Sequence, residues 1–123
     1  MADDITIQGY GGEALAQPVY GTIAAASGSA INVPLPFTPS IVEVAIRTGV
    51  NDLVIARCVL ALGTSATVPY EWVLSESSGT LNTTISTTTP VISAYAGTDG
   101  KEGFTIGAGY LAASDVVLFI AWP

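Results

Sequence analysis

Hydrophobic and polar residues alternate over much of the chain, and its longest apolar run lies close to the C-terminal end. This run, residues 116–122, is rich in β-branched and aromatic residues, and we expect a strand that is buried on both faces. Residues 104–106 alternate between two glycines and predict a neighbouring strand, with residues 114–115 as the turn. The pattern therefore predicts a hairpin at the centre of the core.

Short strands separated by turns are expected from Pro18 onward. Candidate strands occupy residues 19–26, 30–35, 40–48, 53–62, 70–74, 81–89 and 91–96. The prolines of residues 34–39 indicate an extended connector between sheets, and the Thr-rich segment 81–89 is typical of an exposed edge strand. Turns recur about every eight to twelve residues, which is typical of sandwiches and jelly rolls. We therefore predict one all-β domain over residues 18–123, an antiparallel, jelly-roll-like β-sandwich.

The first 17 residues fit this domain less well. Ile5 and Ile7 alternate with polar residues, but three glycines between positions 9 and 12 interrupt any regular element. We predict an extended N-terminal arm, residues 1–17, that becomes ordered on a partner through Ile5, Ile7, Tyr10 and Leu15. The alternative is that the segment forms a first edge strand packed on its own domain.

Composition changes this picture by pointing to contacts with other molecules. Hydrophobic residues make up 50% of the chain and charged residues only 11%, against a usual charged share of about a quarter. Part of the surface is therefore expected to be buried between copies or against partners. The net charge of −7 would repel phosphate groups, so neither nucleic acid nor an anionic membrane surface is an expected partner.

No residue pattern indicates catalysis, a cofactor or a metal site, and we expect no enzyme. The chain has no histidine, which excludes histidine-based triads and the usual zinc sites. Its single cysteine, Cys58, stands in an apolar run and is expected to be a small buried hydrophobe. Two weaker alternatives are a glycosidase pair, Glu71 with Glu76, and a calcium loop with Asp99 and Glu102. Solvated surface acids are the favoured interpretation of these carboxylates.

The aromatic residues divide into anchors and one alternative binding platform. Phe104, Phe119 and Trp122 are expected to anchor the core or a subunit interface. Trp72, Tyr70 and Tyr95 are expected to be core residues, as strand aromatics usually are. The alternative is that these three residues form a platform on which a sugar stacks.

Two segments resemble small β-sandwich virion proteins of tailed bacteriophages. Residues 37–44 read Phe-Thr-Pro-Ser-Ile-Val-Glu-Val, and residues 103–107 read Gly-Phe-Thr-Ile-Gly ahead of the apolar strand that ends at Trp122. The resemblance implies a capsid decoration or cement protein, or else a tail or head-fibre accessory. It also implies contacts with the major capsid protein or another virion protein. The acidic N-terminus, with no apolar run behind it, is not expected to be a secretory signal, so we expect synthesis in the host cytoplasm. The resemblance implies that the protein is assembled there into a virion.

The same segments are similar to H-type lectin domains, which are small sandwiches that bind sugars at subunit junctions. This resemblance implies a carbohydrate-binding module as the alternative function, so a glycan is a possible partner. With two arginines and no histidine, the chain offers little of such a sugar site, and no lectin residue is transferred to it. Both resemblances imply self-association, and we predict a homotrimer.

Overall fold

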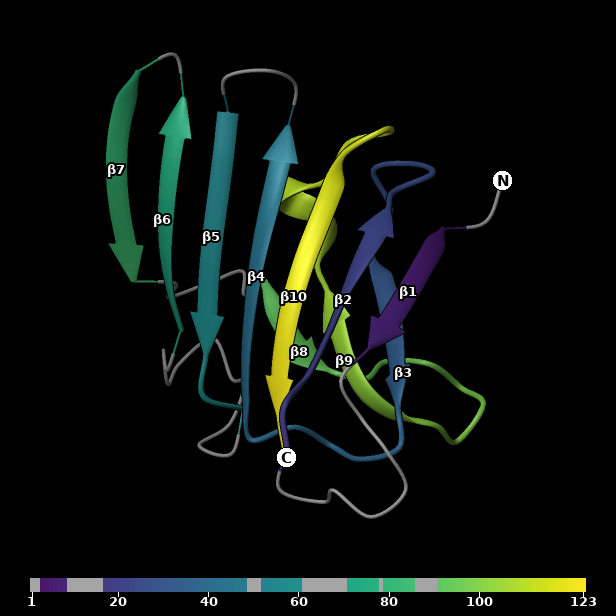
Figure 1. Cartoon of the computed structure of the whole chain (residues 1–123). Coiled ribbons are helices and arrows are strands. Elements are labelled where there is room, and N and C mark those ends of the chain that lie inside the picture. The colour runs from purple at the N-terminus through teal and green to yellow at the C-terminus, as the bar shows by residue number, and fades with distance from the viewer. Residues whose placement is uncertain (1–2, 9–16, 49–51, 61–70, 78, 86–90) are drawn as a thin grey trace.

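The computed structural model describes residues 3–8, 17–48, 52–60, 71–77, 79–85 and 91–123, which form two antiparallel sheets (Figure 1). The strands are β1 (Asp4–Gln8), β2 (Val19–Ala24), β3 (Ile31–Leu35), β4 (Ile41–Thr48), β5 (Asp52–Cys58), β6 (Glu71–Ser77), β7 (Thr80–Ile85), β8 (Ile92–Ala94), β9 (Glu102–Ile106) and β10 (Val116–Trp122). A 3-10 helix spans Ala108–Tyr110, and no α-helix occurs among the described residues. The predicted all-β sandwich is confirmed.

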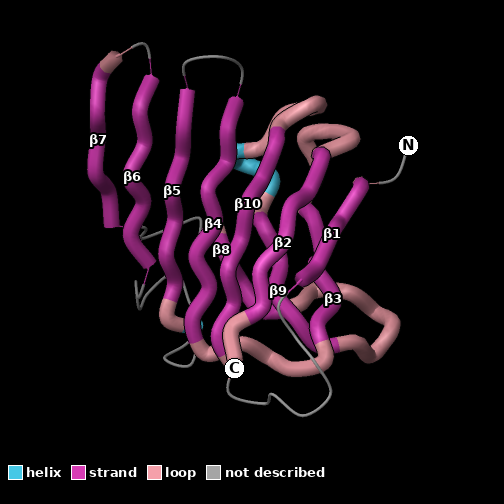
Figure 2. Tube along the Cα trace, viewed as in Figure 1, coloured by secondary structure: helices cyan, strands magenta, loops and turns pink. Residues whose placement is uncertain are grey.

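The two sheets differ greatly in size. The large sheet has the order β1-β2-β10-β4-β5-β6-β7, and the small sheet has the order β3-β9-β8. The small sheet lies behind the large one in Figures 1 and 2, where β6 and β7 extend to the side of it. Residues 36–40 carry the chain from β3 in the small sheet to β4 in the large sheet, as the prolines predicted.

The core lies between the sheets, and strands of the large sheet such as β2, β5 and β10 contribute alternate residues to it. In β10, Val117, Phe119 and Ala121 are buried and point toward the small sheet. The ring of Phe104, in β9, meets the ring of Phe119 edge to face, with centroids 5.3 Å apart. Buried edge-to-face pairs of this kind stabilise a core by about 0.5–1.5 kcal/mol beyond the area that they bury.

The predicted hairpin of residues 104–106 and 116–122 is wrong, because β9 and β10 belong to opposite sheets. The segment between them is a crossover, not a two-residue turn: it contains the 3-10 helix and buries Leu111. Asp115 closes the end of this crossover, since its Oδ2 accepts a hydrogen bond of 2.8 Å from the backbone N–H of Ala112. The two strands therefore meet through their side chains rather than through backbone hydrogen bonds.

The part of the predicted arm that the structure describes belongs to the domain itself. Residues 4–8 form β1, the edge strand of the large sheet, which pairs with β2. Ile5 and Ile7 are partly buried against the core, and Asp3 Oδ1 accepts a 2.7 Å hydrogen bond from the N–H of Ala26. This arrangement is the edge-strand alternative. Tyr10 and Leu15 lie outside the described residues, so their binding to a partner stays a prediction.

Candidate interaction surface

The face of the large sheet that points away from the small sheet is unusually apolar. We call this face, formed by alternate residues of β1, β2, β10, β4, β5, β6 and β7, the outer face. All the large hydrophobic side chains that are exposed among the described residues lie on it, with exposed fractions between 38% and 63%: Tyr20, Leu53, Trp72, Leu81, Val116, Leu118 and Ile120. A sheet face exposed only to water would carry polar side chains at these positions.

The strand register arranges these side chains in rows across the sheet. One row runs from Tyr20 through Ile120, Glu43 and Arg57 to Trp72. The next row is almost entirely apolar and reads Thr22, Leu118, Ala45, Ile55 and Leu74. The Cβ atoms of directly opposed residues on neighbouring strands are about 4.5–5.5 Å apart. The rows therefore form a continuous surface rather than scattered hydrophobic residues.

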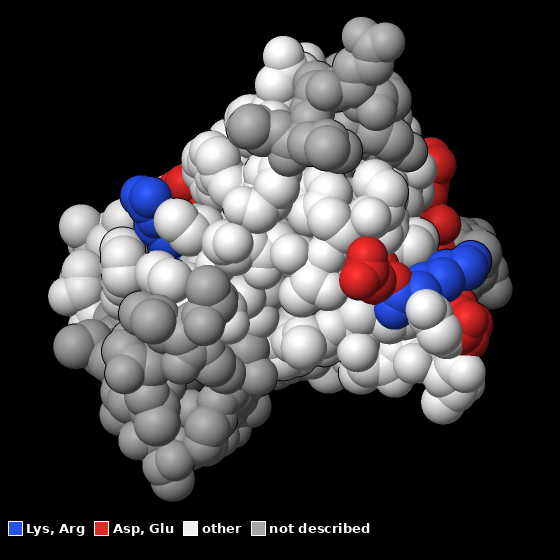
Figure 3. Space-filling model, turned by 90° about the horizontal axis from the view of Figure 1, so that it is seen from below, with Lys and Arg blue, Asp and Glu red and all other residues white. Residues whose placement is uncertain are grey.

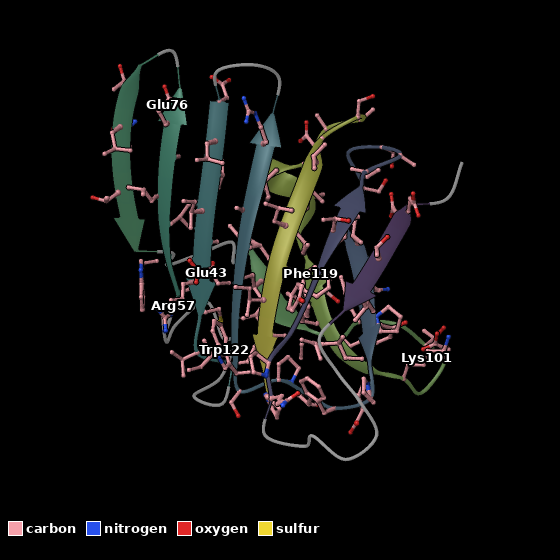
Figure 4. All side chains as sticks on the ribbon, viewed as in Figure 1. Glu43, Arg57, Glu76, Lys101, Phe119 and Trp122 are labelled. Carbon is pink, nitrogen blue, oxygen red and sulfur yellow. The ribbon has the colours of Figure 1, made fainter. Side chains whose placement is uncertain are left out.

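Arg57 lies between two tryptophans on this surface. Its guanidinium carbon is 5.9 Å from the ring centroid of Trp72 and 5.9 Å from that of Trp122. At this distance a guanidinium is attracted to the faces of aromatic rings. Arg57 is also the cross-strand neighbour of Glu43, which lies on β4. Figure 4 shows Glu43, Arg57 and Trp122 in the same region of the large sheet.

The aromatic expectations are therefore met only in part. Phe104 and Phe119 lie in the core, with exposed fractions of 0% and 2%. Trp122 lies on the outer face, partly buried. The expectation that Trp72 is a core residue is wrong, because its side chain is 50% exposed. Tyr70 lies outside the described residues, and Tyr95 follows β8 of the small sheet, so the three aromatics do not form the platform considered from the sequence.

A groove of about 350 Å³ crosses the outer face at β1, β2 and β10. It is lined by Thr6, Tyr20, Thr22, Leu118 and Ile120, together with Gly21 and Phe119. Gly21 makes the close packing beneath it possible, because a Cβ at this position would overlap the carbonyl oxygen of Thr6 and come 2.8 Å from the Phe119 ring. The groove is therefore a largely apolar recess in the outer face.

Charge is distributed unevenly over the molecule. The outer face carries both arginines, Arg47 and Arg57, against three acids, Asp4, Glu43 and Glu76, which leaves it a net charge of −1 out of the −7 of the chain. Seen from below, the charged side chains gather in a small group on the left and a larger group on the right, with uncharged surface between the two groups (Figure 3). The outer face is thus close to neutral in an acidic protein.

The carboxylates considered for catalysis do not come together. Glu71 faces the interior and is 3% exposed, so its expected role as a solvated surface acid is wrong. Its two oxygens accept hydrogen bonds of 2.7 Å from the backbone N–H groups of Val91 and Ile92. Glu76 stands on the opposite face of β6, where it accepts a hydrogen bond from Gly79. In a glycosidase pair the two carboxyl groups flank one glycosidic bond, about 5–10 Å apart in a site that the sugar can enter.

Asp99, considered for a calcium loop, is bound by its own loop. Its carboxylate accepts hydrogen bonds from the hydroxyl of Tyr95, at 3.1 Å, and from the N–H of Lys101, at 3.2 Å. The hydrogen bond from the Lys101 backbone is the main cause that lowers the pKa of Asp99 below its usual value. No group of three or more candidate metal ligands occurs in the part of the chain that the structure describes.

Cys58 is buried directly across from Glu71 in the sheet. Burial, and secondarily the nearby charge of Glu71, raise the pKa of its thiol to about 12. The thiol therefore stays protonated at neutral pH and is a poor nucleophile.

No protein-family model matches the chain, and neither a characterised protein nor a solved structure is significantly similar to it. Within the described segments, no helix has the length and apolar character needed to span a bilayer. The properties of the outer face are accordingly the main basis for assigning a function.

Proposed function

We propose that the chain is a non-enzymatic structural protein of a bacteriophage virion, which acts by surface contact as a capsid decoration or cement protein. The observation that carries this proposal is the outer face, where seven large hydrophobic side chains are 38–63% exposed. Contiguous apolar patches of this kind mark sites of association with other proteins. The resemblance of residues 37–44 and 103–107 to virion sandwich domains supplies the class of assembly.

The state of the reactive side chains favours a structural role over a catalytic one. Both oxygens of Glu71 are engaged by backbone N–H groups, and the thiol of Cys58 is buried with a raised pKa. Catalytic groups, in contrast, need access to a substrate and a pKa suited to proton transfer. We therefore assign the chain no reaction.

Immunogold electron microscopy tests this proposal. An antibody against the chain is applied to particles purified from lysates of infected or induced cells that carry the gene, with antibody pre-adsorbed on the pure protein as the control. We expect gold on capsids, in numbers that indicate many copies per particle. Particles that carry no label, although the lysate contains the protein, would contradict the proposal, and label on tails alone would point to the tail accessory instead.

A second candidate function, glycan binding, is favoured by the surroundings of Trp72. This indole is 50% exposed and stands beside Arg57, which in turn faces Glu43. A sugar ring can stack on an exposed indole while charged neighbours bind its hydroxyl groups. On a glycan array, binding by the wild type that is lost in Trp72→Ala and kept in Tyr95→Ala would support this function; no binding by the wild type would contradict it.

A further inference from the structure

The exposed apolar area of the outer face is close to what one half of a stable interface requires. The seven exposed hydrophobic side chains leave on the order of 600 Å² in contact with water, because a large side chain presents roughly 150–250 Å². A standard interface buries about 800 Å² on each partner. The polar and half-buried residues of the same rows can supply the difference. The face is therefore large enough to form a complete interface with one flat partner.

The charge distribution favours a second copy of the chain as that partner. Outside the outer face the protein carries most of its net charge of −7, so other contacts between copies bring like charges together. The outer face has a net charge of −1 and holds both arginines. Two copies can approach through this face with the least repulsion.

The order of residues on the face is self-complementary. We consider a two-fold axis that lies just above the outer face, runs parallel to the strands and passes over the space between β4 and β5. Rotation about this axis places β4 over β5 of the second copy and β10 over β6 of the second copy. This rotation does not change the position of a residue along the strand direction, so residues of the same row face each other. Glu43 therefore meets Arg57 of the second copy, and Arg57 meets Glu43 of the second copy. The same operation places Leu118 over Leu74, and Ile120 over Trp72. Every contact occurs twice, as a closed two-fold interface requires.

We propose that the outer face docks on the outer face of a second copy, in a face-to-face dimer centred on reciprocal Glu43–Arg57 pairs. Aligned sheets pack about 10 Å apart with their strands within roughly 30° of each other, so residues beside the axis keep their opposition. This inference shares with the proposed function the use of the outer face for contact, and it names the partner. It would replace the trimer implied by the resemblances.

Charge-swap variants of the full-length chain test the pairing by light scattering during size exclusion. Glu43→Arg places two arginines opposite each other, and Arg57→Glu places two glutamates opposite each other. Each variant alone should weaken the dimer by at least about tenfold. An equimolar mixture should restore the dimer, because each contact then joins Arg to Glu. Lys101→Glu and Glu102→Arg make the same charge changes on exposed residues in and beside the small sheet and should remain dimeric.

Each outcome of these measurements either supports the dimer or overturns it. A wild type with twice the mass of 12.5 kDa, monomeric single variants and a dimeric mixture support the inference. A monomeric or trimeric wild type, single variants that stay dimeric, or a mixture that stays monomeric would each overturn it. If a charge swap prevents folding, Leu118→Lys and Leu74→Glu replace the pair, since the same axis places them opposite each other. A monomer that still labels capsids would overturn this inference and leave the proposed function standing, whereas a dimer that labels no particle would do the reverse.

Discussion

Glu71 shows how one buried carboxylate ties the two sheets together. It stands on the inner face of β6, and the N–H groups of Val91 and Ile92, at the start of β8, donate to its two oxygens. We expect Glu71→Gln to lower the free energy of unfolding by about 1–3 kcal/mol, because the amide NH₂ can no longer accept one of these bonds. Urea unfolding measures this change. Glu102→Gln, on an exposed residue, is the control and should change little; equal effects would contradict the role of Glu71.

The buried thiol of Cys58 should make stability depend on alkaline pH. Its pKa is raised from 9.0 to about 12 in the folded protein, so the unfolded chain loses this proton first as the pH rises. The contribution of Cys58 is fully present below pH 9 and decreases as the pH rises toward 12. The stability difference between the wild type and Cys58→Ala should therefore shrink above pH 9. A difference that is constant across this range, measured by urea unfolding, would contradict the assignment.

Gly21 is required by the packing of β1 and Phe119 on β2. A Cβ at this position would overlap the carbonyl oxygen of Thr6 and lie 2.8 Å from the Phe119 ring. We expect Gly21→Ala to destabilise the fold by about 1–3 kcal/mol or more, which thermal unfolding would detect. The matched control is Gly109→Ala, where the added methyl group has no atom within 4 Å. A Gly21→Ala melting temperature equal to that of the wild type would show that β1 is not packed as described.

At the level of elements, the packing of β1 distinguishes a domain with its own edge strand from a domain with a separate N-terminal arm. Ile5 and Ile7 pack against the core, while Thr6 between them faces outward. We expect the double variant Ile5→Ala/Ile7→Ala to lose about 2–4 kcal/mol of stability, less than two fully buried side chains would cost. Thr6→Ala should leave stability nearly unchanged. If the double variant unfolds at the same urea concentration as the wild type, residues 4–8 do not stabilise the domain. That result would support the prediction that they belong to an arm.

The strands were predictable because alternation and turn residues are local signals, whereas the sheet to which each strand belongs was not. Residues 104–106 and 116–122 both read correctly as strands, yet they lie in opposite sheets. Nothing in nine intervening residues distinguishes a hairpin loop from a crossover, because the deciding contacts are made with distant strands. The carboxylate of Glu71 could have been placed, since it shares its face of β6 with the buried Val73.

The exposure of the outer face was not predicted from the sequence, for a related reason. In β10, Val117, Phe119 and Ala121 are buried, while Val116, Leu118 and Ile120 are 39–53% exposed. An apolar residue at every position predicts a strand that is buried on both faces. The isolated chain covers only one of these faces with its own small sheet. The sequence pattern would describe the strand correctly in an assembly in which a partner covers the outer face.

At the level of the whole molecule, the sandwich is uneven, because the three strands of the small sheet cover one face of the seven-stranded large sheet. Its inner face is covered by β3, β9 and β8, and its outer face combines apolar rows with a near-neutral charge. The acidic remainder of the surface limits contacts elsewhere.

Hydroxyl-radical footprinting of the pure protein in a dilution series tests the central claim, that the outer face is a contact surface between two copies of the chain, most directly. Trp72, Tyr20 and Leu118 are half exposed in the single chain, so radicals should modify them readily in dilute solution. We expect strong protection of all three at high concentration, with Tyr95, beside the small sheet, as an unchanged internal reference. Equal modification of these residues at every concentration, or protection of Tyr95 instead, would contradict the account.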